Sequence, residues 1–167
     1  MSGAIPAIVL AGSRPGPDPL LTGSGVSTKA LLPIAGQAML VHVVRALRAS
    51  PEVGAITILA QNSAELAAES GLAGLADLHF ADSGQGISSS LAAALPPGDD
   101  PLLVTTADNV LLTPAMIAEF LTGAADSDVA VAMVEREVLL ARYPQSQRTW
   151  LKFRGGRGVA TLLGLAL

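Results

Sequence analysis

The sequence predicts an α/β fold, a three-layer α/β/α sandwich built around a mostly parallel sheet. Short apolar runs of strand length alternate with stretches of helical spacing along the 167 residues, as in strands joined by crossover helices. Hydrophobic residues make up 50% of the chain and charged residues 14%, against about 25% charged in an average domain. That composition excludes intrinsic disorder and suits one buried core. We therefore expect residues 1–167 to form a single domain.

Continuous apolar runs predict the strands. In chain order, the expected strands are Ile5–Ala11, Ala55–Ala60, Leu78–Ala81, Leu102–Thr106, Val129–Val134 and Thr149–Phe153. Apolar residues that recur every three or four positions predict the helices. The expected helical segments are Met39–Leu47, Ser63–Ser70, Ser88–Leu95, a helix that begins after Thr113, and a single turn at Val138–Arg142. A turn is expected at Pro96–Pro101.

Two of the helix starts carry capping signals. Ser63 is expected to cap its helix through its hydroxyl group. Thr113 precedes Pro114, and proline is favoured at the first position of a helix. The expected buried face of that second helix consists of Met116, Ile117, Phe120 and Leu121.

Two segments show the pattern expected of neither a helix nor a buried strand followed by a helix. Gly12–Thr28 is rich in Gly, Pro, Ser and Asp, so we expect a loop, and loops of this length are usually functional or mobile. Gly158–Leu167 is almost wholly apolar, whereas chain ends are usually polar and frayed. Either this last segment is buried, or the native protein continues beyond it.

Composition and charge exclude several classes of function. The net charge is −4 and the ten basic residues are scattered, so no basic stripe for nucleic acid is visible. Cysteine is absent, and His42 and His79 are too few and too far apart for a zinc site. The longest apolar stretch, Ala30–Val44, falls short of the ~18–20 residues of a membrane span. No basic segment precedes Ile5–Ala11, so a signal peptide is not expected. We expect a cytoplasmic protein that binds neither nucleic acid nor membrane.

Polar residues follow the predicted strands at the edge where parallel sheets bind ligands. After the first strand comes Leu10-Ala11-Gly12-Ser13-Arg14, where a glycine allows close approach of a phosphate and successive N–H groups form an anion-binding nest. Lys29 is the only lysine before Lys152. The plainer alternative is a strand-to-loop glycine beside a solvated lysine. The spacing fits neither a P-loop nor the dinucleotide fingerprint.

Two further loops share that edge. Asp108 follows the strand Leu102–Thr106, where a carboxylate either holds Mg²⁺ or caps a turn. The segment Gly84–Leu91 has two glycines and three serines at the start of a helix. It offers hydrogen bonds to a base or phosphate, although, taken alone, the segment is better explained by serines that compete for the N-cap. Asp82, just upstream, is either a ligand contact or a turn residue.

Taken together, these motifs resemble a known group. The run Ile8-Val9-Leu10-Ala11-Gly12 and the segment from Gly25 to Leu40, with Lys29-Ala30-Leu31-Leu32-Pro33, look like the nucleotidyltransferase superfamily with the Rossmann-like GT-A-like fold. Its members open with L-A-G-G and continue with K-x-L-L-P-x-x-G-x-P-M-L. The segments Gly86–Leu91 and Thr106–Val110 are most similar to the molybdenum cofactor guanylyltransferase-like group. The matches span about residues 5–122.

The resemblance implies a reaction. A phosphate-bearing acceptor attacks the α-phosphorus of an NTP (GTP or CTP) with Mg²⁺ as cofactor, and pyrophosphate leaves. The implied catalytic residues are Lys29, Arg14 and Asp108, with Asp108 also holding the metal. The implied nucleotide-binding residues are Leu10, Ala11, Gly12, Ser13, Asn62, Asp82, Ser89 and Ser90. Nucleotide binding is further expected to order the loop Ser13–Thr28.

The chain also departs from the family pattern. Ser13 replaces the second glycine, Val110 stands where the group often has proline, and no candidate for a second metal-binding carboxylate follows Glu137. The loop before Lys29 is closer in length to that of sugar-phosphate nucleotidyltransferases. Two alternatives therefore stay open: a sugar-phosphate nucleotidyltransferase, and a non-catalytic nucleotide-binding domain of the same fold. A third, a flavodoxin-like or other doubly wound binding protein, would show a different strand order.

Overall fold

The computed structural model describes residues 3–13, 16–84, 86–95, 100–146, 150–152 and 158–166. Its central sheet has the strand order β5-β4-β1-β6-β9-β7, with β8 paired to β9. The strands are β1 Ile5–Leu10, β4 Val53–Ala60, β5 Leu78–Asp82, β6 Leu102–Thr106, β7 Val129–Glu135, β8 Leu151–Lys152 and β9 Gly158–Ala166. β1 pairs in parallel with β4 and β6, and β4 pairs in parallel with β5, whereas β9 is antiparallel to its neighbours.

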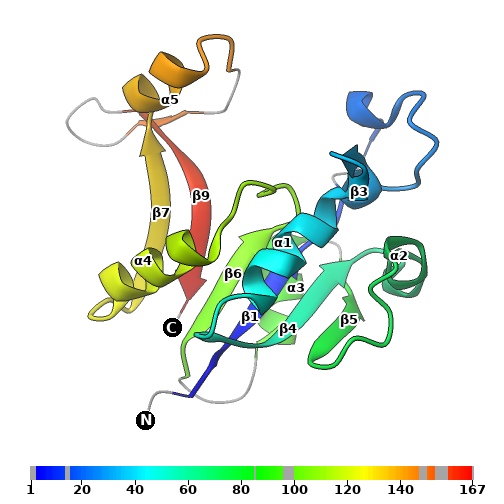
Figure 1. The fold of residues 1–167 in the computed structure, drawn as a ribbon, viewed down its shortest axis with the longest axis horizontal. Helices are drawn as coiled ribbons and strands as arrows, with labels where there is room; N and C mark the ends of the chain where they lie inside the picture. Colours follow the sequence, from blue (N-terminus) through cyan, green and yellow to red (C-terminus); the bar gives the residue numbers. More distant parts are fainter. Residues whose placement is uncertain are drawn as a thin grey trace.

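Helices cover both faces of this sheet (Figure 1). The α-helices are α1 Met39–Arg48, α2 Ser63–Ser70, α3 Ile87–Ala94, α4 Pro114–Ala124 and α5 Arg136–Arg142, and the 3-10 helices are η1 Pro19–Leu21 and η2 Lys29–Leu31. Buried residues of α1, α2 and α4 join one core cluster, while α3 packs against a second cluster on the opposite face. The predicted three-layer sandwich is thereby confirmed. Among the described helices, none has the length and apolar character needed to cross a bilayer.

The two core clusters follow from alternation along each strand. Val9 and Leu103 are fully buried on the face of α1 and α4, whereas Ile8 and Leu102 are buried on the face of α3. Successive side chains of a strand point to opposite faces, so a strand covered on both sides must be apolar throughout. Each fully buried aliphatic side chain contributes about 1.5–3 kcal/mol relative to an exposed one.

The apolar segment near the C-terminus forms part of the sheet. β9 lies between β6 and β7 and pairs with both, through Leu103↔Leu165 and Ala130↔Leu165 among others. At its other end it pairs with β8. In Figure 1, β7 and β9 extend beyond the other strands and carry α5 at their far end. The segment is therefore an interior strand over its described residues.

Several predicted boundaries need correction. Ser63 does not cap α2, because the N-cap is Asn62, in left-handed backbone conformation, and the Ser63 N–H donates to the Asp82 carboxylate. α3 begins at Ile87, one residue early, and α5 begins at Arg136 instead of Val138. Residues 96–99 of the expected turn, and residues 149 and 153 of the last expected strand, lie outside the described residues.

In α4, the cap is as predicted and one core residue is not. The Thr113 hydroxyl accepts from the Met116 N–H, and Pro114 follows it in the first turn. The Met116 side chain is 41% exposed, whereas Ile117 is fully buried. Met116 lies at the margin of the buried stripe, which Ile117, Phe120 and Ala124 form.

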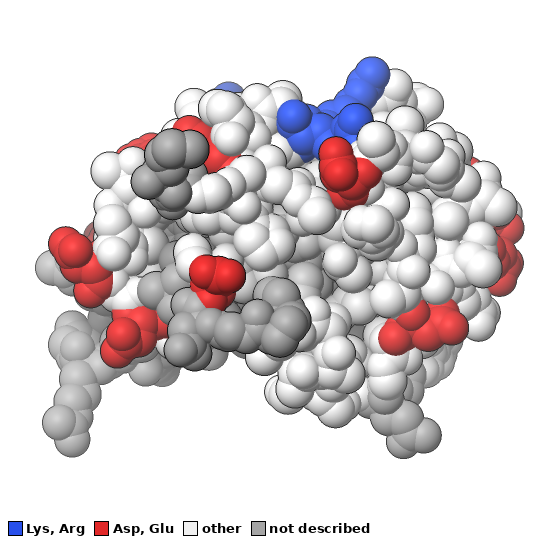
Figure 2. Space-filling view, turned by 90° about the horizontal axis from the view of Figure 1, so that it is seen from below, with Lys and Arg blue, Asp and Glu red and all other residues white. Residues whose placement is uncertain are grey.

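The molecular surface carries little charge. Figure 2 shows the face seen from below in Figure 1, where most atoms belong to uncharged residues, acidic side chains are scattered and basic ones gather in one small patch. This face offers no extended basic stripe of the kind that tracks a nucleic-acid backbone.

Candidate functional site

The carboxyl ends of β5, β4, β1 and β6 lie side by side at one edge of the sheet, because these neighbouring strands are parallel. At the end of β1, the Ala11 N–H donates to Leu59 of β4 (2.8 Å) and the Leu10 carbonyl accepts from Ala107 beyond β6 (3.0 Å). The segment of residues 11–13, called the β1 turn below, is thus held between β4 and the loop that follows β6. The sequence predicted that the loops after β1, β5 and β6 share one edge, and the structure confirms it.

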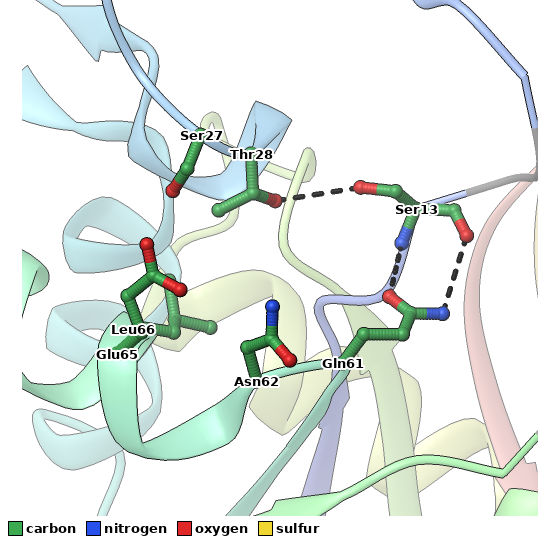
Figure 3. A pocket seen from close by; sticks show the side chains of 7 residues that line it. All are labelled: Ser13, Ser27, Thr28, Gln61, Asn62, Glu65 and Leu66. Carbon is green, nitrogen blue, oxygen red and sulfur yellow. Dashed lines mark hydrogen bonds between the residues drawn. The ribbon is translucent and has the colours of Figure 1, made fainter.

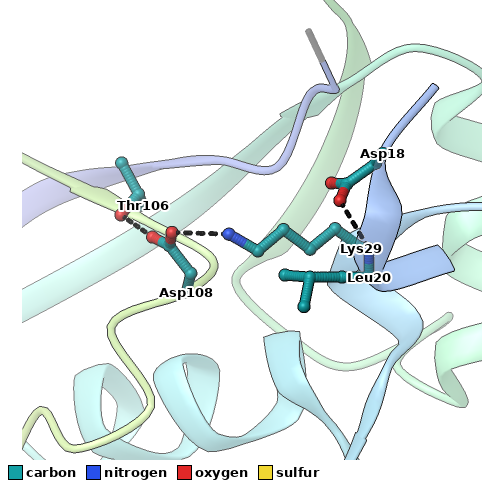
Figure 4. Close-up of polar contacts among 5 residues, drawn as sticks. All are labelled: Asp18, Leu20, Lys29, Thr106 and Asp108. Atoms are coloured by element: carbon teal, nitrogen blue, oxygen red, sulfur yellow. Dashed lines mark hydrogen bonds and ion pairs between the residues drawn. The ribbon is translucent and has the colours of Figure 1, made fainter. Parts of the chain in front are cut away.

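An ion pair joins two of the predicted residues across this edge (Figure 4). Lys29 Nζ lies 2.9 Å from Asp108 Oδ2, although 79 positions separate the residues in sequence. The Thr106 hydroxyl donates a short hydrogen bond to Asp108 Oδ1. The side chains of Lys29 and Asp108 are 35% and 49% exposed, so both are open to a ligand.

Local structure explains how Lys29 reaches Asp108. η2 begins at Lys29, and its next two residues, Ala30 and Leu31, are buried in the core. A short antiparallel hairpin follows, with strands β2 Pro33–Ile34 and β3 Gln37–Ala38, and leads into α1. The two-residue turn places Gly36 at φ 81°, a conformation that glycine adopts without strain. The segment that directly follows Lys29 is therefore anchored in the core and in the hairpin.

The ion pair and hydrogen bonds also set the ionisation of Asp108. Burial alone would raise its pKa, but the hydrogen bonds from Thr106 and Lys29 and the positive charge of Lys29 outweigh burial, so the pKa of Asp108 lies below its ordinary value of 3.8. The group is a carboxylate at neutral pH. Such an oxygen ligand suits Mg²⁺, which is usually bound by one or two carboxylates together with substrate phosphates.

A cleft of about 410 Å³ lies where the segments after β1 and β4 meet the residues before Lys29 (Figure 3). It is lined by Ser13, Ser27, Thr28, Gln61, Asn62, Glu65 and Leu66. Two hydrogen bonds to Ser13 hold the side chain of Gln61: its Oε1 accepts from the Ser13 N–H (2.8 Å), and its Nε2 donates to the Ser13 carbonyl (3.3 Å). The Ser13 hydroxyl lies 3.4 Å from that of Thr28. The cleft therefore adjoins both the β1 turn and the residue before Lys29.

Sequence reasoning missed five of these lining residues: Ser27, Thr28, Gln61, Glu65 and Leu66. For Gln61 a signal was present. It directly follows a strand expected to end at Ala60, and so lies at the same sheet edge as the predicted site residues. Glu65 and Leu66 lie on α2, and the sequence pattern alone does not show that this helix borders the β1 turn.

The remaining predicted residues take varied places. Asn62 lines the cleft. Asp82 Oδ1 accepts from the Ser63 N–H at 2.9 Å, and this backbone hydrogen bond lowers the pKa of Asp82. The hydroxyls of Ser89 and Ser90 both donate to the Gly86 carbonyl, within the first turn of α3. Arg14 lies outside the described residues.

Within the described part of the chain, Asp108 is the acidic residue that pairs with Lys29. Across the described ranges, no group of three or more His, Cys, Asp or Glu side chains is placed to hold a metal ion. A metal at Asp108 would therefore need further ligands from water or substrate, which is the usual arrangement for Mg²⁺ bound to a triphosphate.

Comparison with known proteins places this geometry in context. A family model, the MobA-like NTP transferase domain, matches residues 7–164. A structure of a hypothetical transferase from Thermus thermophilus is similar at 28% identity and a TM-score of 0.75, over 98% of this chain and 65% of that one. This chain thus spans just under two thirds of that protein. No curated protein gave a significant match.

Two enzymes of known activity share the fold. A 4-diphosphocytidyl-2C-methyl-D-erythritol synthase from Anaerococcus prevotii has a TM-score of 0.64 at 8% identity, over 96% of this chain and 68% of that one. A CMP:2-keto-3-deoxy-manno-octonic acid synthetase complexed with CTP has a TM-score of 0.64 at 15% identity, over 97% and 73%. These two likenesses show the fold alone. The match along nearly the whole chain shows more: the chain belongs to the family of MobA-like NTP transferase domains.

Proposed function

We propose that this chain transfers a nucleoside monophosphate from an NTP to a phosphate-bearing acceptor, with release of pyrophosphate. The acceptor oxygen forms a bond to the α-phosphorus while the bond from that phosphorus to the pyrophosphate oxygen breaks. An acceptor phosphate is already ionised at neutral pH, so it needs no general base. Family membership supports this reaction type.

The observation that carries the proposal is the 2.9 Å contact between Lys29 and Asp108. A lysine and a carboxylate from distant parts of the chain meet at the ligand-binding edge of the sheet. Both are partly exposed. The pair provides one positive charge for phosphate oxygens and one hard oxygen ligand for a divalent cation.

Each residue then has a distinct task. Lys29 would hold the triphosphate and neutralise charge that grows during the reaction, which is the main contribution of a phosphoryl-transfer site. Asp108 would hold Mg²⁺, and the ion supplies charge stabilisation to the phosphate oxygens when bound. The backbone at Gly12 and Ser13 would bind phosphate through N–H groups. Arg14 would bind the leaving pyrophosphate, since a guanidinium grips phosphate oxygens in pairs.

The cleft lined by Ser13 and Thr28 is proposed to receive the rest of the nucleotide. Its polar lining, which includes Asn62 and Glu65, offers both donors and acceptors to a ribose or base. We propose GTP or CTP as the donor. The resemblance to the molybdenum cofactor guanylyltransferase-like group favours GTP and a small phosphate-bearing acceptor of molybdenum cofactor biosynthesis. CTP stays a candidate because a synthetase complexed with CTP has the same fold.

A nucleotide screen tests the proposal. Each of the four ribonucleoside triphosphates is added with and without Mg²⁺, and the midpoint of thermal unfolding is recorded, because a ligand bound only by the native state raises stability. Pyrophosphate release is then measured with candidate acceptors. We expect Mg²⁺-dependent stabilisation by GTP or CTP, and its loss in Lys29→Gln and Asp108→Asn.

Two exposed residues away from the site provide charge-matched controls. Arg45→Gln on α1 removes one positive charge, and Asp126→Asn after α4 removes one negative charge. Both controls should behave like the wild type. Binding without any pyrophosphate release would support the non-catalytic alternative, and no stabilisation by any triphosphate would overturn the proposal.

A further inference from the structure

We propose that Gln61 is a positioning residue for the β1 turn, and that position 12 is glycine in order to accommodate the Gln61 side chain. In this role Gln61 fixes Gly12 and Ser13 so that the Gly12 N–H faces the Lys29–Asp108 pair. The inference rests on the proposed function, because it assigns this N–H to the triphosphate. It concerns a residue that none of the sequence motifs includes.

The Gln61 side chain continues the pairing of β1 with β4 beyond the ends of both strands. The register ends at Leu10↔Leu59, and the Ala11 N–H still donates to the Leu59 carbonyl. At the next step, the Gln61 amide accepts from the Ser13 N–H at 2.8 Å and donates to the Ser13 carbonyl at 3.3 Å (Figure 3). A primary amide carries one acceptor and two donors, so it replaces the backbone groups that a further β4 residue would supply.

This contact sets the direction of the Gly12 backbone. Backbone groups of successive residues in a strand point to opposite edges. Ala11 and Ser13 both bond toward β4 and Gln61, whereas the Leu10 carbonyl bonds to Ala107 beyond β6. By this alternation, the Gly12 N–H faces the side of β6. Asp108 follows Ala107 on that side and holds Lys29, so a phosphate bound by Lys29 would lie near the Gly12 N–H.

The absence of a side chain at Gly12 follows from the same contact. Gly12 is not among the described glycines with positive φ, so its backbone conformation does not require glycine. A Cβ atom built there would lie 3.1 Å from Gln61 Oε1 and 3.2 Å from Nε2. At these distances the Gln61 amide must shift by a few tenths of an ångström, which strains its hydrogen bonds to Ser13. Glycine at this position therefore preserves the two hydrogen bonds of Gln61.

The turn held by Gln61 also reaches the lysine loop. The Ser13 hydroxyl lies 3.4 Å from the Thr28 hydroxyl, and Thr28 directly precedes Lys29. Gln61 thus links the loops after β1 and β4 to the start of η2. Its own side chain is exposed, so its replacement removes these links without opening the core.

A double-mutant cycle tests the inference. The variants are Gln61→Ala, Gly12→Ala and the double variant, and the dissociation constants of Mg·GTP, Mg·CTP, guanosine and cytidine are measured. Each single change should weaken binding of the triphosphate by about 10-fold, the loss of one hydrogen bond to a charged group. Nucleoside binding should weaken less, because a nucleoside has no phosphate for the Gly12 N–H to bind. The double variant should bind the triphosphate as tightly as the single variant with the lower affinity, because both changes break the same contact.

The matched control is Gln37→Ala. The Gln37 amide also accepts a side-chain hydrogen bond, from Arg45, but lies on the β2–β3 hairpin. This variant should bind nucleotides like the wild type. Losses that multiply in the double variant would overturn the inference, because they would mean that the ligand itself requires glycine at position 12. Equal loss of nucleoside and triphosphate affinity would also overturn it.

A second measurement separates this inference from the proposed function. Hydrogen exchange of the Ser13 amide, recorded by NMR without nucleotide, should be faster in Gln61→Ala than in the wild type. If the wild type binds neither GTP nor CTP, the proposed function fails, and Ser13 exchange still decides whether Gln61 fixes the turn. If the wild type binds and Gln61→Ala binds equally well, the inference fails and the proposed function stands.

Discussion

Removal of the charge of Lys29 should change two affinities in opposite directions. In the free protein Lys29 Nζ occupies Asp108 Oδ2 at 2.9 Å, so a Mg²⁺ ion must compete with the ammonium group for that carboxylate. In the nucleotide complex, Lys29 would instead face the phosphates. Lys29→Gln should therefore strengthen binding of Mg²⁺ alone and weaken binding of the Mg²⁺–triphosphate complex.

The structure bounds the size of each effect. The two side chains are 35% and 49% exposed, and an ion pair this open to solvent contributes about 0.2–1 kcal/mol. Its loss should improve Mg²⁺ affinity by at most about 5-fold. A charge-assisted hydrogen bond to phosphate contributes about 1.5–3 kcal/mol. Its loss should weaken triphosphate binding by roughly 10- to 100-fold.

Isothermal titration at fixed ionic strength measures both quantities. Mg²⁺ is titrated into the wild type, Lys29→Gln and Arg45→Gln, and Mg·GTP and Mg·CTP are then titrated into the same three proteins. The Arg45 variant also loses one positive charge, but from α1, and so controls for the effect of net charge on both affinities. A weaker Mg²⁺ affinity in Lys29→Gln, or an unchanged triphosphate affinity, would refute the reasoning.

Three further outcomes are expected. Asp108→Asn should abolish Mg²⁺-dependent stabilisation by GTP or CTP. Because the pKa of Asp108 is lowered in the folded state, the carboxylate stabilises the fold above about pH 4, and this stabilisation disappears as the pH falls through the folded pKa. Equal acid unfolding profiles of variant and wild type would contradict the ion pair. Thr113→Ala should lower the free energy of unfolding by about 1 kcal/mol in urea titrations, since the hydroxyl caps α4, and no change would mean that the cap contributes nothing. Hydrogen exchange between Gly16 and Thr28 should slow when Mg·GTP or Mg·CTP binds, and strong protection already present in the free protein would exclude closure of this loop.

The sheet could be predicted from the sequence because its strands are buried on both faces. β6 was predicted to the residue, Leu102–Thr106, and β1 to within one residue, since apolar runs flanked by turn residues leave little choice of boundary. β7 is half exposed, and there the alternating exposure of Val131 and Ala132 gives a weaker signal. The position of β9 between β6 and β7 depends on long-range pairing, which no local pattern encodes.

The candidate site could likewise be predicted from the sequence only in part. Lys29 and Asp108 could be predicted, because Asp108 directly follows a buried strand and Lys29 opens the Lys29-Ala30-Leu31-Leu32-Pro33 motif, and the structure brings them together. Gln61 could not be assigned, because its importance arises from two hydrogen bonds to a residue 48 positions away. Ser63 shows the opposite error: a local rule proposed its hydroxyl as the cap, whereas the carboxylate of Asp82 on the neighbouring strand accepts the Ser63 N–H.

The place of β9 in the sheet has a consequence for biosynthesis. β7 precedes β9 in the chain, yet among the described strands it pairs only with β9. Until β9 has left the ribosome, the parallel strands from β5 to β6 already have their mutual partners, but β6 presents an open edge and β7 has no strand beside it. Unpaired edges of this kind favour association between nascent chains. Pairing of β9 closes both gaps at once, so chaperone contact should be concentrated before β9 pairs and should fall once it has paired.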